Sequence, residues 1–471
     1  MDFEKQSRRQ SLKVIISESI MVLAVIIMVV VLAFIVSGYW LNSDFEVKRQ
    51  GMLQISSVPT GADVEIDGES SWLQRTNTSK VLESGEHTVK LTKEGYDSWE
   101  KTINISEGLL YRIHYPRLFL NNRSPEKLFS TAEITNATVS PDHESLLLMN
   151  KTTEWLLVKL NNEKLEPKKI NVAEIFSGSS LTSDATVGIL SSEILDVDWS
   201  LDGMRALFKV RSDGNLEWII LNFDNVKNSI NLTKEFGVNF NAVKMLDRSA
   251  NSLLVVQNNN LHRIDVPGRS ISSVLAEKIF DFDYYNNEVF FSASLSEADE
   301  SENKYYIGKI KLGDNKIIQL GKFISPPKLA VTEFYEDKFI FTLEENTVTV
   351  YRANDFSERA SYQLGFTPET IKVGHEGEFI TMHDGRTIAT IDMEARAVRE
   401  WSVEGENFGW VDNDMIYTVF DGELIVYDFD GFNRRVIAKN VLSHFPVAIT
   451  DDRYLYYFSD SYLVREWLIP R

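Results

Sequence analysis

The chain has 471 residues, of which 43% are hydrophobic and 25% are charged. That length suits roughly two or three domains, each with a core of its own. The formal net charge is −20, so the surface repels phosphate backbones and we expect no nucleic-acid partner. The absence of cysteine excludes disulfides, thiolate metal sites and cysteine nucleophiles.

The N-terminal region joins a basic tail to a long apolar run. Ile20 to Val36 are 17 consecutive apolar residues without a charge. The tail before them is net positive, with Lys5, Arg8, Arg9 and Lys13 against Asp2 and Glu4. A membrane helix needs about 20 apolar residues, and cytoplasmic flanks are enriched in Lys and Arg. The sequence predicts a cytoplasmic tail at residues 1–13 and a transmembrane anchor at residues 14–41, with the lipid bilayer as partner.

Two other interpretations of the apolar run are open. A buried core helix is disfavoured, because the run has no polar face to leave in water. A cleaved signal peptide usually has a shorter apolar region of about 7–15 residues, although Ser37-Gly38 offers small residues for cleavage. We favour the uncleaved anchor. It predicts a single-pass protein of the cell membrane whose bulk, after Asn42, is extracytoplasmic.

Residues 52–118 show short runs in which apolar and polar side chains alternate. Val64 and Ile66 alternate with polar neighbours and precede Asp67-Gly68, which is a hairpin-turn signal. Further strand-like runs cover residues 85–96, 99–105 and 110–118. Five or more short strands in about 65 residues predict a small β-sandwich.

These residues resemble the PEGA family of bacterial surface domains. The name-giving tetrad is present as Pro59-Thr60-Gly61-Ala62. The resemblance also rests on the order and spacing of Val64, Ile66, Asp67, Gly68, Gly85, His87, Val89, Leu91, Gly95 and Tyr96. It implies a surface-exposed, immunoglobulin-like, non-enzymatic module, with no reaction to carry over. The family commonly continues with a Gly-x-Thr-Pro turn, in whose place residues 69–78 read ESSWLQRTNT.

Trp72 lies in this replaced segment, which we expect to be an irregular turn. An exposed aromatic side chain there could stack on a sugar or anchor a protein partner. The alternative, which we favour, is that Trp72 packs over the open end of the sandwich. Trp72 is therefore carried forward as a candidate ligand contact.

From residue 125 to the end, a unit of three strands and two turns recurs eight times. An apolar strand leads through a turn containing Asp, Asn or Gly to two further strands. The units cover residues 137–160, 195–224, 241–266, 279–312, 329–354, 371–393, 408–428 and 445–469. One more strand stands before each unit, so each unit counts four strands, the size of a propeller blade.

The order of these strands predicts how a ring would close. Residues 126–131 supply the outer strand of a blade whose other three strands lie at residues 445–469. Pairing the two ends would leave no free edge strand. We therefore expect an all-β chain with an eight-bladed β-propeller at residues 125–471. Seven blades would require that one unit, the first or the third being the weakest, is not a blade.

Two turns support this architecture. Ser140-Pro141-Asp142 and Ser200-Leu201-Asp202-Gly203 are similar to the Ser-Pro-Asp-Gly turns of WD-type and TolB-type propellers. Asp428-Phe429-Asp430-Gly431 is similar to them more weakly. A tandem of β-sandwiches is the alternative, but it would need repeats of about 90 residues or more.

Two pairs of carboxylates occupy predicted inner strands. Asp196 and Asp198 share one face of a strand, and so do Asp281 and Asp283. Inner strands line the channel of a propeller, so a cation could bind there. The alternative, which we favour, is that these groups accept hydrogen bonds from the backbone or loops. We predict no metal and no cofactor, and keep the four residues as candidate ligand contacts.

Sequence motifs of serine hydrolases, zinc proteases and phosphate loops are absent. We therefore expect a non-catalytic, membrane-anchored binding or scaffold protein of the bacterial cell envelope. It would recognise a protein or glycan ligand through the propeller. The alternatives are an envelope enzyme or processing factor with a loop-built site on the propeller face, and an accessory subunit of an envelope complex.

Overall fold

The computed structural model describes residues 19–30, 32, 39–41, 47–176, 192–212, 214–295, 304–314, 316–374, 377–405, 408–412 and 414–469. The chain divides into two compact units, Met1–Asn121 and Asn122–Arg471. Strands dominate both units. The all-β class predicted from the sequence is confirmed.

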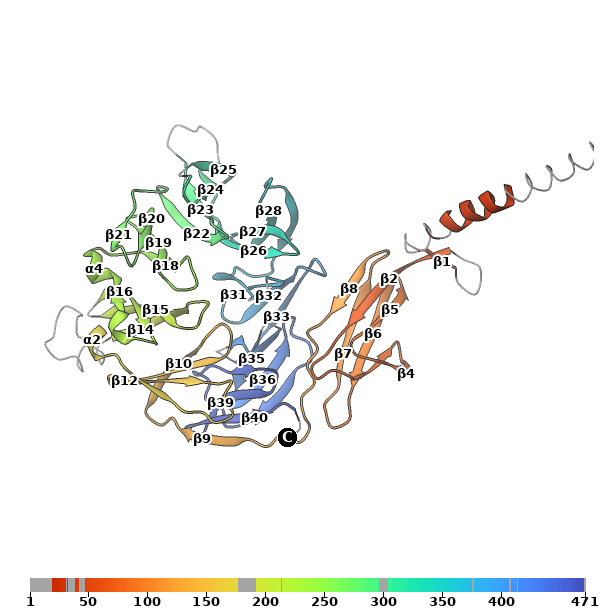
Figure 1. Ribbon diagram of the computed structural model, residues 1–471, viewed down its shortest axis with the longest axis horizontal. Helices are drawn as coiled ribbons and strands as arrows, with labels where there is room; N and C mark the ends of the chain where they lie inside the picture. Colours follow the sequence, from red (N-terminus) through yellow and green to blue (C-terminus); the bar gives the residue numbers. More distant parts are fainter. Residues whose placement is uncertain are drawn as a thin grey trace, which may run out of the picture. The chain divides into compact units, whose positions relative to one another are not determined.

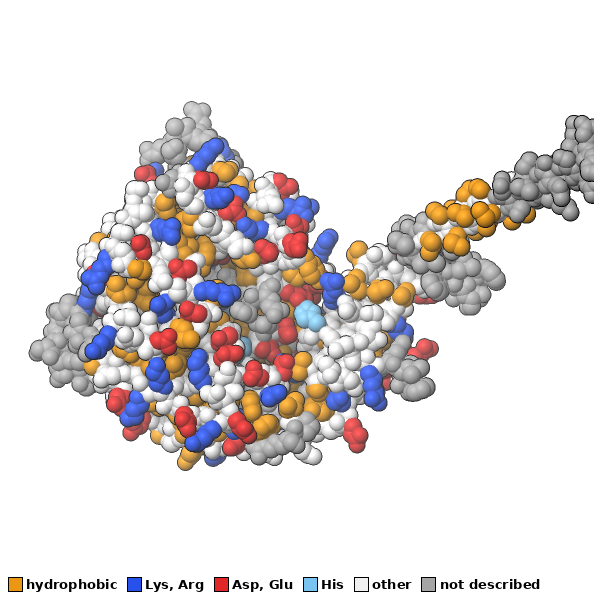
Figure 2. Space-filling view, viewed as in Figure 1, with side chains coloured by type: hydrophobic (Ala, Val, Ile, Leu, Met, Phe, Trp, Pro, Cys, Tyr) orange, Lys and Arg blue, Asp and Glu red, His pale blue; other side chains and the backbone are white. Residues whose placement is uncertain are grey.

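The N-terminal helix is described in part. Residues 19–30 and 32 are helical, and their large apolar side chains are 50–66% exposed (Figure 2). Within the part of the chain that the structure describes, no helix has the length and hydropathy to span a membrane. The predicted tail at residues 1–13 lies outside the described residues, and the predicted anchor at residues 14–41 lies partly outside them.

The first unit contains two four-stranded sheets (Figure 1). One has β2 (Val47–Ile55) between β1 (Tyr39–Leu41) and β5 (Thr78–Glu83), with β8 (Leu110–Ile113) parallel to β2. The other has the order β4 (Glu69–Arg75), β3 (Asp63–Ile66), β6 (Gly85–Thr92) and β7 (Trp99–Ile105). Val64, Val89, Leu91 and Trp99 are at most 2% exposed, so the predicted alternation does fill a core.

The segment that we expected to be an irregular turn is a strand. β4 pairs antiparallel with β3, with Glu69 opposite Ile66 across the turn at Asp67-Gly68. Both turn residues have positive φ, the backbone of a two-residue hairpin, so the chain returns at once along the edge of β3. Trp72 therefore lies within β4 and not in a loop. Its side chain is outside the described residues.

The second unit contains eight four-stranded antiparallel sheets, which stand around a common centre in Figure 1. In the first seven, four consecutive strands pair in chain order. Sheets one to four are β10–β13 (Ile134–Val139, Ser145–Asn150, Glu154–Lys159, Lys168–Asn171), β14–β17 (Ser192–Trp199, Arg205–Ser212, Asn215–Asn222, Ile230–Asn231), β18–β21 (Ala242–Met245, Ser252–Gln257, Asn260–Asp265, Ser270–Ile271) and β22–β25 (Ile279–Tyr285, Glu288–Ser294, Tyr305–Lys311, Ile317–Phe323).

The remaining sheets continue the same plan. Sheets five to seven are β26–β29 (Lys328–Phe334, Asp337–Glu344, Thr347–Arg352, Glu358–Gln363), β30–β33 (Thr370–Val373, Phe379–His383, Thr387–Asp392, Ala397–Ser402) and β34–β37 (Phe408–Trp410, Met415–Phe420, Glu423–Asp428, Arg435–Ala438). Short helical turns α2 (Ala173–Phe176), η1 (Val226–Asn228) and α4 (Leu232–Phe236) lie between strands.

The eighth sheet joins the two ends of this unit. It consists of β38 (Ala448–Thr450), β39 (Tyr454–Ser459), β40 (Tyr462–Trp467) and β9 (Glu126–Ser130). β9 pairs antiparallel with β40, with Phe129 opposite Leu463. A guanidinium nitrogen of Arg465 also donates to Glu126 Oε2 at 3.0 Å. The first strand thus occupies the outer position of the last sheet, which is the pairing that the strand order in the sequence leads us to expect.

Neighbouring sheets pack face to face through their apolar middle strands. In β11 (SLLLMN), Leu147 belongs to a buried core shared with the second sheet. Its neighbour Leu148 belongs to a core shared with the eighth sheet. Successive side chains of a strand point to opposite faces, so each middle strand serves two interfaces. This explains why these strands are continuous apolar runs and not alternating ones.

Ser140 and Ser200 organise equivalent turns in the first two sheets. Ser140 Oγ donates to Asp142 Oδ1 at 2.5 Å, and Ser200 Oγ donates to Asp202 Oδ1 at 2.6 Å. In each turn the serine oxygen also accepts the backbone N–H five residues later, at 2.9 Å. The similarity seen in the sequence is therefore a similarity of hydrogen bonding.

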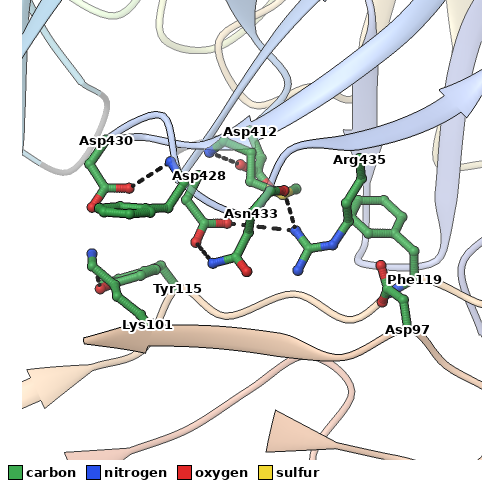
Figure 3. A network of polar contacts seen from close by, with 11 residues as sticks. Asp97, Lys101, Tyr115, Phe119, Asp412, Asp428, Asp430, Asn433 and Arg435 are labelled. Carbon is green, nitrogen blue, oxygen red and sulfur yellow. Dashed lines mark hydrogen bonds and ion pairs between the residues drawn. The ribbon is translucent and has the colours of Figure 1, made fainter. Parts of the chain in front are cut away.

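The segment from Asp428 to Gly431 has a different place in its sheet. It follows β36, the third strand of the seventh sheet, whereas the two serine turns follow first strands. Asp428 is buried, and its Oδ2 accepts a hydrogen bond from Asn433 Nδ2 at 2.8 Å (Figure 3). Asp and Gly occur in tight turns of every kind. Their presence therefore does not indicate whether a turn follows the first or the third strand of a sheet.

Candidate functional site

The four candidate aspartates of the second unit lie on first strands, as predicted. Asp196 and Asp198 are in β14, and Asp281 and Asp283 are in β22. Side chains two residues apart in a strand share a face, which sets the two members of each pair side by side. Asp196 and Asp198 are exposed to water, whereas Asp281 and Asp283 are half-buried.

The β22 pair binds the first strand of the next sheet. Asp281 Oδ2 accepts the Leu329 N–H at 2.8 Å, and Asp283 Oδ2 accepts the Val331 N–H at 2.9 Å. The N–H groups of Leu329 and Val331 are two residues apart and point to the same side of β26. Asp281 and Asp283 have the same spacing on β22, so each carboxylate meets one N–H group. The pair thus fastens the fourth sheet to the fifth.

Lys244 of β18 links the third sheet to the same place. Its ammonium donates to the Phe282 carbonyl at 2.7 Å and to Asp283 Oδ1 at 3.1 Å. Asp283 therefore has one oxygen on a backbone N–H and the other on a cation. This arrangement satisfies a half-buried carboxylate without a metal.

Asp198 is the most perturbed of the four. Its side chain is exposed at the surface of the strand, but the protein atoms around it still reduce its contact with bulk water. This desolvation, then repulsion from Asp196, raises the pKa of Asp198 to about 6, although Lys244 and Lys372 oppose the shift. Lys372 belongs to β30 of the sixth sheet, so a cation from a sheet distant in the sequence acts on Asp198. The first strands of the second, third and sixth sheets thus carry acidic and basic groups that act on one another.

Two of these carboxylates also accept hydrogen bonds from the residue that follows them in the strand. Asp281 Oδ1 accepts the N–H of Phe282, and Asp196 Oδ1 accepts the N–H of Val197. Over the described ranges there is no group of three or more histidine, aspartate or glutamate side chains placed to hold a metal ion. Trp72 belongs to the first unit, whereas the four aspartates belong to the second.

Sequence patterns did not reveal a pocket between the second and third sheets. It has a volume of about 720 Å³, and its lining includes Arg205, Lys227, Lys234, Asn251 and Arg269. On the face shown in Figure 2, basic and acidic side chains are interspersed. The residues of this pocket are spread over more than 60 positions of the sequence, and no compact motif joins them.

A second pocket, of about 660 Å³, lies between the fifth and sixth sheets. Phe334, Tyr335 and Tyr362 give it an aromatic wall, and its charged side chains have both signs. Tyr335 is among the exposed large side chains of this unit. The unit therefore offers two polar hollows at sheet boundaries.

Comparison with known proteins identifies the first unit. Residues 50–117 match the model of the PEGA domain, which confirms the resemblance drawn from Pro59 to Tyr96. No curated protein matches the chain in sequence.

Several solved structures are similar to the chain. An oligogalacturonate lyase in complex with manganese is 14% identical, with 59% of this chain and 90% of that chain covered and a TM-score of 0.40. Hsv2p of Kluyveromyces lactis is 10% identical, with 65% and 98% covered and a TM-score of 0.42. The β-propeller domain of Cps50 (Swd1) from Myceliophteria thermophila is 9% identical, with 74% and 100% covered and a TM-score of 0.42.

Proposed function

We propose that this chain is a membrane-anchored, extracytoplasmic binding or scaffold protein of the bacterial cell envelope. The observation that carries the proposal is the helix at residues 19–30, whose large apolar side chains are at least half exposed. Apolar surface of this kind is unfavourable in water, and a lipid bilayer accounts for it. The basic tail then stays in the cytoplasm and both β units lie outside. The PEGA domain supports a surface location.

In this proposal the second unit is an eight-bladed propeller that does the binding. Each of the eight sheets is one blade, and the pairing of β9 with β40 closes the ring. The inner carboxylates on β14 and β22 hold the protein's own backbone, which supports a structural role for them and not a catalytic one. The ligand is a protein or glycan of the envelope, and the PEGA domain is a spacer or second binding module.

One observation favours the alternative of an envelope enzyme. Asp198 has a pKa of about 6, faces water and lies in the field of Lys244. Perturbed carboxylates of this kind occur at catalytic sites as well as in structural ion-pair networks. The enzyme would use Asp198 as a general acid on the propeller face.

Protease treatment of intact cells that express the full chain tests the topology. After any wall is opened, external protease should digest both β units and leave a short protected N-terminal fragment. Protection of the whole chain would contradict the proposal. A mature protein whose first residue is Tyr39 would show that the apolar segment is cleaved as a signal peptide.

A further inference from the structure

The pocket between the second and third sheets is rich in positive charge. Four cationic side chains line it, and Glu235 is the only carboxylate among its described lining residues. Arg269 lies 3.1 Å from Glu235 Oε1 and keeps most of its side chain exposed. In a chain of net charge −20, this local excess of cations needs a specific explanation.

Lys234 is the most informative of the four cations. It belongs to α4, and its Nζ is buried without a hydrogen-bond partner among the described residues. Burial lowers the pKa of Lys234, and the charge of Glu217 only partly offsets this. Glu217 is itself held by Asn231, whose Nδ2 donates to Glu217 Oε2 at 2.7 Å. A buried ammonium with open donor positions is unfavourable unless an anion approaches it.

The rest of the lining suits a molecule with both hydroxyl groups and C–H faces. Besides the five charged residues, five lining residues carry amide or hydroxyl groups and five are aliphatic or proline. Amides can donate to and accept from the hydroxyls of a sugar, and aliphatic side chains can cover its C–H faces. The volume of about 720 Å³ is in the range of small-ligand sites, roughly 300–1,000 Å³.

We propose that this pocket binds an acidic saccharide, whose carboxylate or phosphate group pairs with Lys234 and Arg269. The inference rests on the proposed function and names the class of ligand and the residues that hold it. An acidic peptide would use the cations equally well, but the neutral lining is half amide or hydroxyl and half aliphatic or proline, which suits the hydroxyls and C–H faces of a sugar ring. Lys227 and Arg205 extend the positive surface along the saccharide.

Calorimetric titration of the detergent-solubilised full chain tests the proposal with four probes. The acidic saccharides are a hyaluronan hexasaccharide, which carries carboxylates, and glucose 1-phosphate, which carries a phosphate. Chitohexaose is the neutral saccharide, and hexaglutamate is the acidic peptide. At least one acidic saccharide should bind more tightly than chitohexaose and hexaglutamate, and its affinity should fall as salt is added. Which of the two binds identifies the acidic group.

Three variants locate the binding. Lys234→Met should weaken binding at least tenfold. Lys227→Met should weaken binding several-fold. Because Lys227 is exposed, this second variant tests the pocket even if Lys234→Met fails to fold. Glu235→Gln should strengthen binding several-fold, because it removes the opposing charge and releases Arg269. Lys164→Met is the matched control, since Lys164 pairs with Glu166 at the surface outside the pocket. It should leave the affinity unchanged.

The proposal would be overturned if neither acidic saccharide bound, if chitohexaose or hexaglutamate bound as tightly, or if both lysine variants kept full affinity. The result can contradict saccharide binding by the pocket without contradicting the proposed binding to the cell envelope. A chain that binds neither acidic saccharide but is still retained by isolated cell envelopes contradicts only the pocket. A chain that binds nothing in either assay contradicts both.

Discussion

His87 Nδ1 lies 2.6 Å from Oδ2 of Asp67, and its Nε2 lies 2.8 Å from the carbonyl oxygen of Glu83. The other oxygen of Asp67 accepts the N–H of Thr88 at 2.8 Å. Asp67 is in the turn between β3 and β4, and His87 is in β6. The pair therefore ties the hairpin turn of the PEGA domain to the strand beside it.

The first prediction concerns the charge of His87. Burial lowers its pKa, but the hydrogen bonds to Asp67 and Glu83 outweigh burial and leave the pKa raised above 6.5. This stabilisation is complete below pH 6.5 and is lost as pH rises through the folded-state pKa. Asp67→Asn removes the charged partner, so the pKa of His87 should fall. An NMR titration of the imidazole in both proteins measures this, and an unchanged pKa would contradict the role of Asp67.

The second prediction concerns ring closure. Deleting residues 445–471 removes the three strands that receive β9 and exposes edges on both sides of the gap. The eighth sheet also shares a buried core with the first, including Phe458 and Leu148. The deletion should lower the melting temperature of the whole second unit. A truncated protein whose second unit melts at the temperature of the full chain would show that the sheets are independent.

The strands were predictable because their signal is local. Alternation around Val64 and Ile66, and continuous apolar runs such as β11, depend only on which faces of a strand are buried. The order of strands was enough to anticipate that residues 126–130 pair with the last sheet. The strand β4 was not predicted, because its residues, ESSWLQR, lack the alternation of apolar and polar side chains that marks β3.

The partners of the site residues were not predictable, because they depend on how sheets are placed. Asp281 accepts the N–H of Leu329, 48 residues away in the next sheet. Lys244 reaches Asp283 from a third sheet. Arg205 and Arg269 meet in one pocket only because the second and third sheets pack side by side. The spacing of these residues in the sequence does not indicate that they are in contact.

The third prediction concerns Asp283. Asp283→Ala leaves the Val331 N–H without its acceptor and removes one of the two acceptors of the Lys244 ammonium, which should cost about 1–3 kcal/mol of unfolding free energy. Asp283→Asn keeps one oxygen acceptor and should cost less. Chemical denaturation of both variants measures the difference. Asp314→Ala is the control for the loss of one carboxylate, because Asp314 is exposed in a turn between strands.

An alanine variant at 283 as stable as the full chain would show that the carboxylate does not fasten the fourth sheet to the fifth. Equal losses in the alanine and asparagine variants would assign the effect to the charge next to Lys244 and not to the hydrogen bond from Val331.

The last prediction concerns Asp198 and pH. Its folded-state pKa of about 6 is above the ordinary value of 3.8, so the folded protein holds this proton more tightly than the unfolded chain. Ionisation of Asp198 therefore destabilises the fold progressively as pH rises from about 4 to about 6. Asp198→Asn removes that penalty, and its amide oxygen can still accept the N–H of Trp199. The variant should melt at a higher temperature than the unmodified chain at pH 7.5, and this gain should vanish near pH 4.

Asp314→Asn, in an exposed turn, controls for the loss of one negative charge. A gain of equal size at both pH values would show that the charge of Asp198 is not its cause.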